Sequence, residues 1–375
     1  MRILFTGGGT GGHFYPIIAV VEQLNRIIKE NKLVNVELYF LSESPYNPSV
    51  LFDHNLIFKK NYAGKLRKYF SIMNFFDLFK TGWGILRSLW TIYLIYPDVM
   101  FGKGGYASFP AMLASRILRI PVIIHESDSV PGRANIWASK FAERIAVSYP
   151  EAAKYFPQEK VAYTGQPIRE DFFLPLRSNA YEFLKLDPSL KTILIIGGSQ
   201  GSQIINDAIT ESVPKLVENY QIIHQTGKFN FEEVQKVSSA VLTRNPNKER
   251  YKIYSYLDSL TLRSAAGIAD LVISRAGSSI FEIAAWGIPS IIIPIQKSNG
   301  DHQIKNAFSY ARTGAAVVIE EANLTGNIIA AEAERILGDQ SIHQRMKSST
   351  SSFVKKDAAR KIAEEILKIA LSHGE

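Results

Sequence analysis

The sequence predicts an α/β protein built on parallel β-sheets that helices cover on both faces. Short apolar runs rich in β-branched residues recur along the 375-residue chain, and segments with helical periodicity separate them. The apolar runs do not alternate with polar residues, which is typical of strands buried on both faces of a sheet. Glycine-rich turns follow several of these runs, as expected at the carboxyl ends of strands in a doubly wound sheet.

The first half of the chain contains five predicted strands and a clear first helix. The helix spans Pro16–Lys29. Proline suits the start of a helix, because an N–H group in the first turn would have no acceptor within the helix. The predicted strands are Arg2–Thr6, Val36–Leu41, Asp98–Phe101, Pro121–His125 and Arg144–Ser148.

The same pattern restarts near Lys191, after an irregular, proline-containing segment, Gly165–Leu190. The sequence therefore predicts two Rossmann-like domains, 1–164 and 165–350. A final helix within 351–375 can pack on either domain, and we expect it on the first; its apolar stripe begins at Phe353. Further strands are predicted at Thr192–Ile196, Gln221–Gln225, Asp270–Ser274 and Ser290–Pro294.

Composition narrows the class of protein. Hydrophobic residues make up 46% and charged residues 21%, which excludes a largely disordered chain. Cysteine is absent, so disulfides, thiolate nucleophiles and cysteine-ligated metals are excluded. No secretory signal and no membrane-spanning helix is predicted.

The first glycine loop, Thr6–His13, lies between a strand and a helix. Its glycines let the backbone approach a ligand closely, and the helix N-terminus favours an anion. Gly7, Gly9 and Gly12 also match the dinucleotide fingerprint, which requires an acidic residue roughly 20 positions later. The nearest candidate at the end of the second predicted strand, Glu43, comes 31 positions after Gly12 and fits poorly.

Two more loops repeat the strand–glycine–helix arrangement. They are Gly102–Tyr106 and Gly197–Gly201. Three such junctions predict three anion-binding helix ends at the carboxyl edges of the sheets, where ligands bind in open α/β folds.

Polar clusters follow other strands. They are His125–Asp128, Ser274–Glu282 and the loop Gln296–Asn306, while Arg169 lies in the connection and could reach a diphosphate. Helix capping is the alternative interpretation for the first cluster. Four of the seven histidines fall in strand-end motifs, which favours a ligand-facing role for them: His13, His125, His224 and His302.

Charge is distributed unevenly. Residues 1–164 carry 19 Lys and Arg against 12 Asp and Glu, whereas residues 165–375 carry 24 against 23. In the first half, basic residues adjoin aromatic ones, a combination suited to an anionic bilayer surface. A nucleic-acid site and a core helix with a basic edge are the alternatives. The membrane candidates are Lys65, Arg67, Lys68, Phe75, Phe79 and Trp83, with Trp90 seven residues beyond.

The motifs together resemble one known family, the MurG glycosyltransferases of peptidoglycan synthesis, over residues 1–340. The resemblance implies two Rossmann-like domains facing across a cleft (the GT-B fold). It also implies inverting transfer of N-acetylglucosamine from UDP-N-acetylglucosamine to lipid I, an undecaprenyl-diphospho-N-acetylmuramoyl-peptide, to give lipid II. The matching motifs are Gly8-Gly9-Thr10-Gly11-Gly12-His13, Gly104-Gly105-Tyr106, His125-Glu126, Gly165-Gln166-Pro167-Ile168-Arg169, Gly197-Gly198-Ser199-Gln200-Gly201 and Arg275-Ala276-Gly277.

The resemblance also implies roles for individual residues. His13 is the first candidate for the catalytic base and Glu126 the second. Donor contacts are expected at Thr10, Gly11, Gly12, Asp128, Arg169, Ser199, Gln200, Tyr256, Leu257, Ser278, Ser279, Glu282 and Gln303. Acceptor contacts are expected at Gly9, Thr10, Gly104, Gly105 and Tyr106.

Two positions depart from the family. Many members carry Asn where this chain has Asp128, and a carboxylate can only accept hydrogen bonds. The loop from Gly277 to Glu282 is one residue shorter. The chain contains no Asp-x-Asp pair for a metal, so we expect helix ends and Arg169 to neutralise the diphosphate.

The expected partners follow from the same resemblance. They are UDP-N-acetylglucosamine, lipid I, the anionic lipids of the cytoplasmic membrane face and other cell-wall enzymes; no metal, resident cofactor or nucleic acid is expected. Three alternatives stay open: another GT-B enzyme that glycosylates a diacylglycerol, a dinucleotide-binding oxidoreductase or sensor, and a non-catalytic scaffold.

Overall fold

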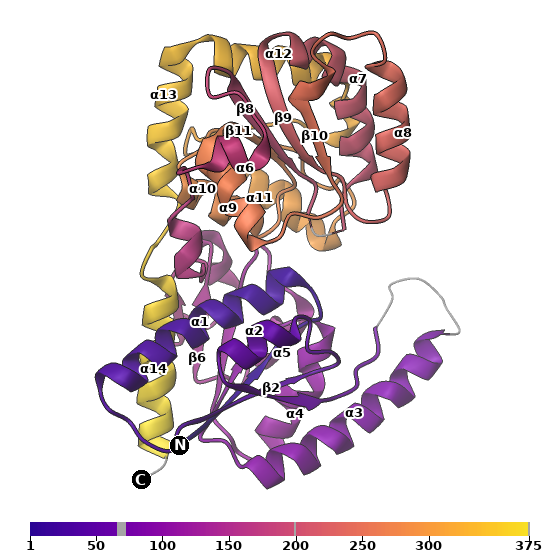
Figure 1. Cartoon of the computed structure of the whole chain (residues 1–375). Coiled ribbons are helices and arrows are strands. Elements are labelled where there is room, and N and C mark those ends of the chain that lie inside the picture. The colour runs from indigo at the N-terminus through magenta and orange to yellow at the C-terminus, as the bar shows by residue number, and fades with distance from the viewer. Residues whose placement is uncertain (66–72, 199, 374–375) are drawn as a thin grey trace. The chain divides into compact units, whose positions relative to one another are not determined.

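The computed structural model describes residues 1–65, 73–198 and 200–373, which form two compact units (Figure 1). Unit 1 joins Met1–Arg169 to the C-terminal segment that begins at Lys355. Unit 2 comprises Glu170–Val354.

Unit 1 contains a seven-stranded sheet in the order β3-β2-β1-β4-β5-β6-β7, and every neighbouring pair is parallel. The chain reverses its direction of winding between β1 and β4, which is where ligands bind in doubly wound sheets. The strands are β1 (Arg2–Thr6), β2 (Glu37–Ser42), β3 (Leu56–Lys60), β4 (Val99–Gly102), β5 (Val122–Glu126), β6 (Arg144–Val147) and β7 (Val161–Tyr163).

Helices and short 3-10 turns complete unit 1. The apolar stripe of α1 packs with β1, β2 and β4 in one core, and the C-terminal helix α14 adds its own stripe to that core beside α1 (Figure 1). The helices are α1 (Gly11–Glu30), α2 (Pro48–Asp53), α3 (Met73–Ile95), α4 (Phe109–Ile117), α5 (Arg133–Ala138) and α14 (Ala358–His373); the 3-10 turns are η1 (Tyr106–Ser108) and η2 (Pro150–Tyr155).

Unit 2 repeats the same topology with six parallel strands in the order β10-β9-β8-β11-β12-β13. Its winding reverses between β8 and β11. The strands are β8 (Lys191–Ile196), β9 (Tyr220–Gln225), β10 (Tyr251–Tyr254), β11 (Ala269–Ser274), β12 (Ser290–Ile292) and β13 (Ala316–Val318).

The helices of unit 2 enclose a second core built on β8, β9 and β11. They are α6 (Ala180–Leu184), α7 (Gln203–Asn219), α8 (Phe231–Val241), α9 (Ser259–Ile268), α10 (Ser279–Trp286), α11 (His302–Ala311), α12 (Gly326–Gly338) and α13 (Gln340–Ser349). Short 3-10 turns are η3 (Glu170–Phe173), η4 (Lys248–Arg250), η5 (Asn299–Asp301), η6 (Glu321–Asn323) and η7 (Thr350–Ser352).

The predicted α/β class with parallel sheets is confirmed, and all nine predicted strands are present. The sequence missed β3, β7, β10 and β13, which are the four edge strands. Edge strands are short and partly exposed, so they lack the continuous apolar run that marks a central strand.

Two predicted helix limits are wrong. Helix α1 begins at Gly11 rather than at Pro16, because the amides of His13 and Phe14 bond to the Thr10 carbonyl. Glycine has a low helix propensity, which hides this first turn in the sequence. The last helix begins at Ala358, and Phe353 instead stacks on Phe281 in unit 2.

Candidate active site

The loop after β1 carries the first group of predicted site residues. Thr10 is the N-cap of α1, and Gly11 and Gly12 form the first turn, whose amide groups have no intrahelical acceptor. The Thr10 hydroxyl lies 2.9 Å from Nδ1 of His13. His13, one turn into the helix, is half-buried, while Gly9 and Thr10 are exposed.

The loop after β4 approaches His13 from a second side. Strands β1 and β4 are paired up to their last residues, and the Lys103 amide donates to the Thr6 carbonyl at 2.9 Å. A Cβ on Gly8 would lie 3.0 Å from Nδ1 of His13, and one on Gly105 would lie 3.4 Å from Nε2. Gly105 also has a φ of 81°. The two loops therefore enclose the imidazole because these positions carry no side chain.

Glu126, at the end of β5, is 4% exposed and bonded through both carboxylate oxygens. Oε1 accepts the Asp128 amide at 3.0 Å, and Oε2 accepts the Gly132 amide at 3.0 Å and Nδ2 of Asn135 at 2.9 Å. Burial and the nearby Asp128 raise the pKa of Glu126, while these three donors lower it. Its carboxylate joins β5 to the start of α5.

The buried neighbours of Glu126 form a second network. Lys103 contacts Ser127 Oγ, and its Nζ lies 2.7 Å from Nδ1 of His125. Nε2 of His125 lies 3.2 Å from the Gly165 carbonyl, and Ser127 donates to Gln166 Oε1 at 2.9 Å. The structure thus brings together the second glycine loop, the end of β5 and the segment after β7.

Burial dominates the electrostatics of this cluster. It lowers the pKa of His13 to about 4, with a further lowering from the Lys103 ammonium and an opposing effect from Asp128. Burial also holds the pKa of His125 well below its ordinary value. Both rings are neutral at pH 7, so His13 can accept a proton.

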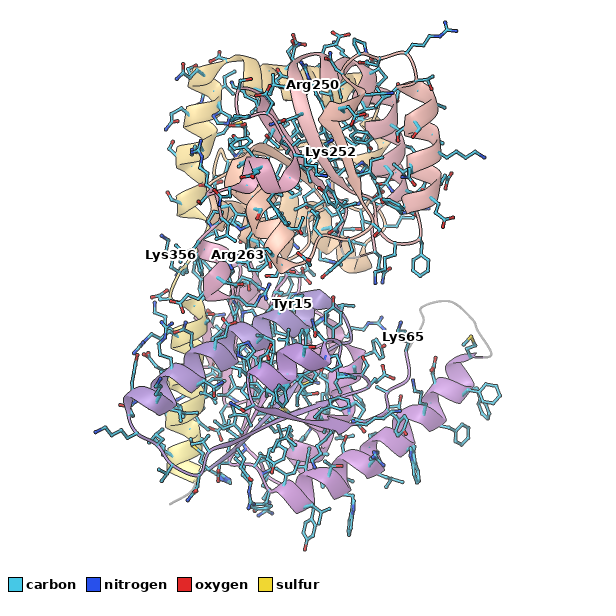
Figure 2. All side chains as sticks on the ribbon, in the orientation of Figure 1. Tyr15, Lys65, Arg250, Lys252, Arg263 and Lys356 are labelled. Atoms are coloured by element: carbon cyan, nitrogen blue, oxygen red, sulfur yellow. The ribbon has the colours of Figure 1, made fainter. Side chains whose placement is uncertain are left out.

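Two other predicted residues of unit 1 contact aromatic rings. The guanidinium of Arg169 lies 4.5 Å from the ring centroid of Tyr15, which projects from α1 (Figure 2). Nζ of Lys65 lies 5.3 Å from the ring centroid of Tyr106. Burial and a hydrogen bond with Glu43 raise the pKa of the Tyr106 hydroxyl to about 12.

Glu43 does not suit the dinucleotide alternative. Its Oε1 accepts Nζ of Lys80 at 2.6 Å and the Ala63 amide at 3.3 Å. The carboxylate that a ribose would need is therefore already paired within unit 1.

In unit 2, the loop after β8 is held against the loop after β9. A Cβ on Gly201 would lie 1.9 Å from the Thr226 carbonyl oxygen, so only glycine fits there. Nε2 of Gln225 donates to the Gly198 carbonyl at 3.0 Å. Gln200 is exposed, and Ser199 lies outside the described residues.

The remaining predicted donor residues of unit 2 lie at the carboxyl edge of its sheet. Ser278 caps α10 without a side-chain bond to the helix, and Glu282 is partly buried in the first turn. Oγ of Ser279 lies 3.4 Å from Oγ of Ser274. Gln303, in α11, accepts the Ile295 amide at 3.1 Å through its side chain.

The loop after β10 carries the last pair. Tyr256 is exposed, and Nζ of Lys228 lies 5.9 Å from its ring centroid. Leu257 is buried, and its amide donates to Gln225 Oε1 at 3.0 Å. This bond ties the loop to the end of β9.

Two residues that the sequence did not assign organise these sites. Lys103 was part of a predicted loop but had no role of its own. Arg275, in the Arg-Ala-Gly motif, pairs with Glu321 at 2.7 Å and donates to Ser202 Oγ at 2.6 Å. Charged residues inside glycine loops at strand ends are a signal that could have found both.

Two of the histidines that the sequence placed in strand-end motifs are not placed for ligand binding. His125 is completely buried, with Nδ1 at 2.7 Å from Lys103 Nζ and Nε2 at 3.2 Å from the Gly165 carbonyl. His224 is completely buried, with Nδ1 at 2.7 Å from the Tyr251 hydroxyl and Nε2 at 3.1 Å from Asn206 Oδ1. His224 is the fifth of the six residues of β9, so its position near the strand end leaves it inside the core and the predicted ligand-facing role is wrong.

Helix α3 presents an apolar face to solvent. Its small residues Gly84 and Ser88 lie against residues 61–62, and Asn61 donates to Ser88 at 2.7 Å. Trp83 and Trp90 are 61% and 64% exposed, and many other large apolar side chains of α3 are exposed as well. This exposure contradicts the interpretation of α3 as a core helix. Phe75 and Phe79 belong to this face; Arg67 and Lys68 lie outside the described residues.

Within 1–65, 73–198 and 200–373, no helix combines the length and apolarity needed to cross a membrane. The same part of the chain holds no group of three or more His, Cys, Asp or Glu side chains arranged for a metal ion.

Comparison with known proteins identifies the family. Residues 3–147 match the glycosyltransferase family 28 N-terminal domain, and residues 192–366 match the family 28 C-terminal domain. These matches cover most of the two units.

Named relatives share sequence along most of the chain. A protein of Bacillus thuringiensis subsp. konkukian is 35% identical over 97% of this chain and 99% of its own length. A Treponema denticola protein is 37% identical over 84% and 83%. Both are named UDP-N-acetylglucosamine–N-acetylmuramyl-(pentapeptide) pyrophosphoryl-undecaprenol N-acetylglucosamine transferase.

Solved structures support the fold. MurG of Acinetobacter baumannii has a TM-score of 0.72 at 24% identity, covering 98% of this chain and 99% of that chain. A UDP-N-acetylglucosamine 2-epimerase of Listeria monocytogenes, described as putative, scores 0.71 at 14% identity, covering 100% and 96%. Because transferases and epimerases share this fold, the family assignment depends on sequence. The chain belongs to glycosyltransferase family 28, among the MurG-type N-acetylglucosamine transferases.

Proposed function

We propose that this chain transfers N-acetylglucosamine from UDP-N-acetylglucosamine to lipid I and so forms lipid II. The observation that carries the proposal is the 35% identity to a relative of that name across 97% of the chain. The two winding-reversal points support it, since each is flanked by a glycine-rich or serine-rich loop that opens a helix.

The proposed reaction is a single displacement at the anomeric carbon. The acceptor hydroxyl oxygen bonds to that carbon, the bond to the UDP oxygen breaks, and UDP leaves with the electron pair. The hydroxyl proton passes to Nε2 of His13. Nδ1 of His13 then carries the other proton and donates to Thr10 Oγ1, which lies 2.9 Å away.

Of the two candidate bases, we favour His13 over Glu126. Both oxygens of Glu126 already accept hydrogen bonds, from three N–H groups. His13 is half-buried between the two glycine loops, and its Nδ1 contact with Thr10 Oγ1 leaves Nε2 as the nitrogen that would take the proton. Glu126 therefore acts as a structural anchor for the loop that carries Asp128.

We assign the domains 1–164 and 165–350 to acceptor and donor, respectively. The acceptor diphosphate binds the loop amides at Gly9–Gly12 and Gly104–Tyr106. The donor residues of unit 2 contact UDP: Ser199, Gln200, Tyr256, Leu257, Ser278, Ser279, Glu282 and Gln303. Arg169 supplies a cation for the diphosphate, so the proposed mechanism uses UDP-N-acetylglucosamine as donor and lipid I as acceptor with no further cofactor.

We also propose that the exposed face of α3 binds the anionic cytoplasmic surface of the membrane. Its aromatic residues Phe75, Phe79 and Trp83 are each more than 60% exposed. Lys65 supplies a cation on the chain segment that leads to this helix. An acceptor carried on undecaprenyl diphosphate is itself held in that membrane, so the two proposals agree.

A transfer assay with radiolabelled UDP-N-acetylglucosamine tests the function directly. Synthetic lipid I and diacylglycerol are supplied separately as acceptors, and NAD binding is measured in parallel. Label in a lipid II product supports the proposal. Label in a glycosylated diacylglycerol, NAD binding without transfer, or lipid binding without transfer would each replace it with one of the alternatives.

A further inference from the structure

Lys103 is a charged residue in the interior of unit 1. Lys103 is 2% exposed, although it lies in the glycine loop that follows β4 at the carboxyl ends of the strands. Burying an ammonium group is costly unless hydrogen bonds and opposite charges compensate. Its partners are the ring of His125 and the hydroxyl of Ser127.

The partner of Nε2 determines which nitrogen of the His125 ring carries the proton. Nε2 of His125 lies 3.2 Å from the Gly165 carbonyl, which can only accept, and 3.2 Å from Ser148 Oγ, which donates its own proton to Gln166 Oε1. Nε2 therefore carries the ring proton. Nδ1 is then the lone-pair nitrogen, and it requires a donor. Lys103 Nζ, 2.7 Å away, is that donor. His125 is therefore a neutral ring in one tautomer, selected by Lys103.

Lys103 also lies beside His13. A Cβ on Gly7 would lie 3.4 Å from Cβ of Lys103 and 3.6 Å from Cβ of His13, so both side chains leave the backbone next to Gly7. Burial lowers the pKa of the His13 ring most, and the Lys103 ammonium lowers it further. Burial also lowers the pKa of Lys103 to about 8, which keeps the group largely charged at pH 7.

We propose that Lys103 is a positioning residue for the transfer reaction: it donates to Nδ1 of His125 and so selects the tautomer of that ring, and its positive charge adds to burial in disfavouring protonation of His13. The charged and titratable groups that face this pair are Glu126 and Asp128 from β5 and the loop after it. Both carboxylates favour the charged state of Lys103. The inference rests on the proposed role of His13 as the base.

Ring-nitrogen NMR of histidine-labelled protein tests the proposal without measuring activity. In the wild-type chain we expect His125 as the Nε2–H tautomer and His13 neutral down to about pH 4. The His13→Ala variant identifies the His13 signal. A wild-type His125 protonated on Nδ1, or on both nitrogens at pH 7, would overturn the proposal with no variant needed.

Two substitutions separate the hydrogen bond from the charge. Lys103→Met removes both, so the selection of the His125 tautomer is lost and the pKa of His13 rises by about one unit. Lys103→Gln retains an amide donor, so the tautomer is preserved while the pKa of His13 still rises. Lys140→Met, which removes an exposed lysine of the same unit, is the matched control and leaves both signals unchanged.

The outcomes distinguish this inference from the proposed function. If His13 and His125 show the same signals in all of these variants, Lys103 is only a packing residue, whatever the transfer assay reports. If the signals shift as expected but lipid I accepts no sugar, the network exists and the proposed function is wrong.

Discussion

Each unit buries a histidine in its central sheet, and the two are held by different partners. His125 in unit 1 receives a hydrogen bond from the charged Lys103, whereas His224 in unit 2 lies between the neutral Tyr251 and Asn206. Burial lowers the pKa of His224 to about 3 and also strongly lowers that of His125. The two rings therefore share a protonation state but not an electrostatic environment.

The difference indicates what each unit does. The buried charge of unit 2, Arg275, is neutralised by Glu321 within the same interior. Unit 1 instead has Lys103 and Asp128 near the half-buried His13, and both Glu126 and Asp128 act on Lys103. We infer that the polar interior of unit 1 controls proton transfer, and that of unit 2 holds loops in place.

The largest expected effect comes from His13→Ala. Removal of a general base lowers kcat by about 10²–10⁴-fold. Binding of UDP-N-acetylglucosamine, measured by calorimetry, should remain within about threefold, because donor contacts are assigned chiefly to unit 2. A kcat within a few-fold of wild type would exclude His13 as the base.

Breaking the buried ion pair of unit 2 should affect stability rather than chemistry. Glu321→Gln leaves Arg275 as a buried cation without its carboxylate and should lower the free energy of unfolding by about 3 kcal/mol. Urea denaturation measures this loss.

The matched control is Glu332→Gln, which removes the carboxylate of a more exposed pair with Arg335 in the same unit. It should cost less than about 1 kcal/mol. Equal losses in the two variants would show that the Arg275 pair has no special structural role.

His224→Gln should change the pH dependence of stability. The folded chain holds His224 neutral, with a pKa of about 3, against 6.5 when unfolded. Below pH 6.5 the unfolded state therefore binds a proton that the folded state refuses, and stability falls as pH falls. Replacing His224 should reduce the loss between pH 7 and pH 5 by about 2 kcal/mol. An unchanged slope in urea denaturation would contradict a neutral His224.

The smallest effect is expected at the membrane. Trp83→Ser should reduce co-sedimentation with anionic vesicles about tenfold, since one large side chain no longer enters the interface. Phe229→Ser, which removes a 92% exposed aromatic ring from unit 2, is the control and should have no effect. Equal loss in both variants would remove the membrane role from α3.

Sequence patterns predicted the central strands and the glycine loops well, because burial and turn geometry are local requirements. They missed the edge strands, where burial is partial, and the first turn of α1, where glycines obscure the helix. They also gave Lys103 no role, since its partner His125 is 22 residues away and depends on Gly165. Such networks arise from tertiary contacts, which no local pattern contains.

The most direct test is the pH dependence of kcat/KM for the wild type, Lys103→Met and His224→Gln. In Lys103→Met we expect the acidic limb of the pH profile to move to higher pH by about one unit, because His13 gains a proton more readily. In His224→Gln we expect the acidic limb to stay at the same pH. A limb that moves equally in both variants, or a uniform loss of rate at every pH in Lys103→Met, would contradict the division between the two units.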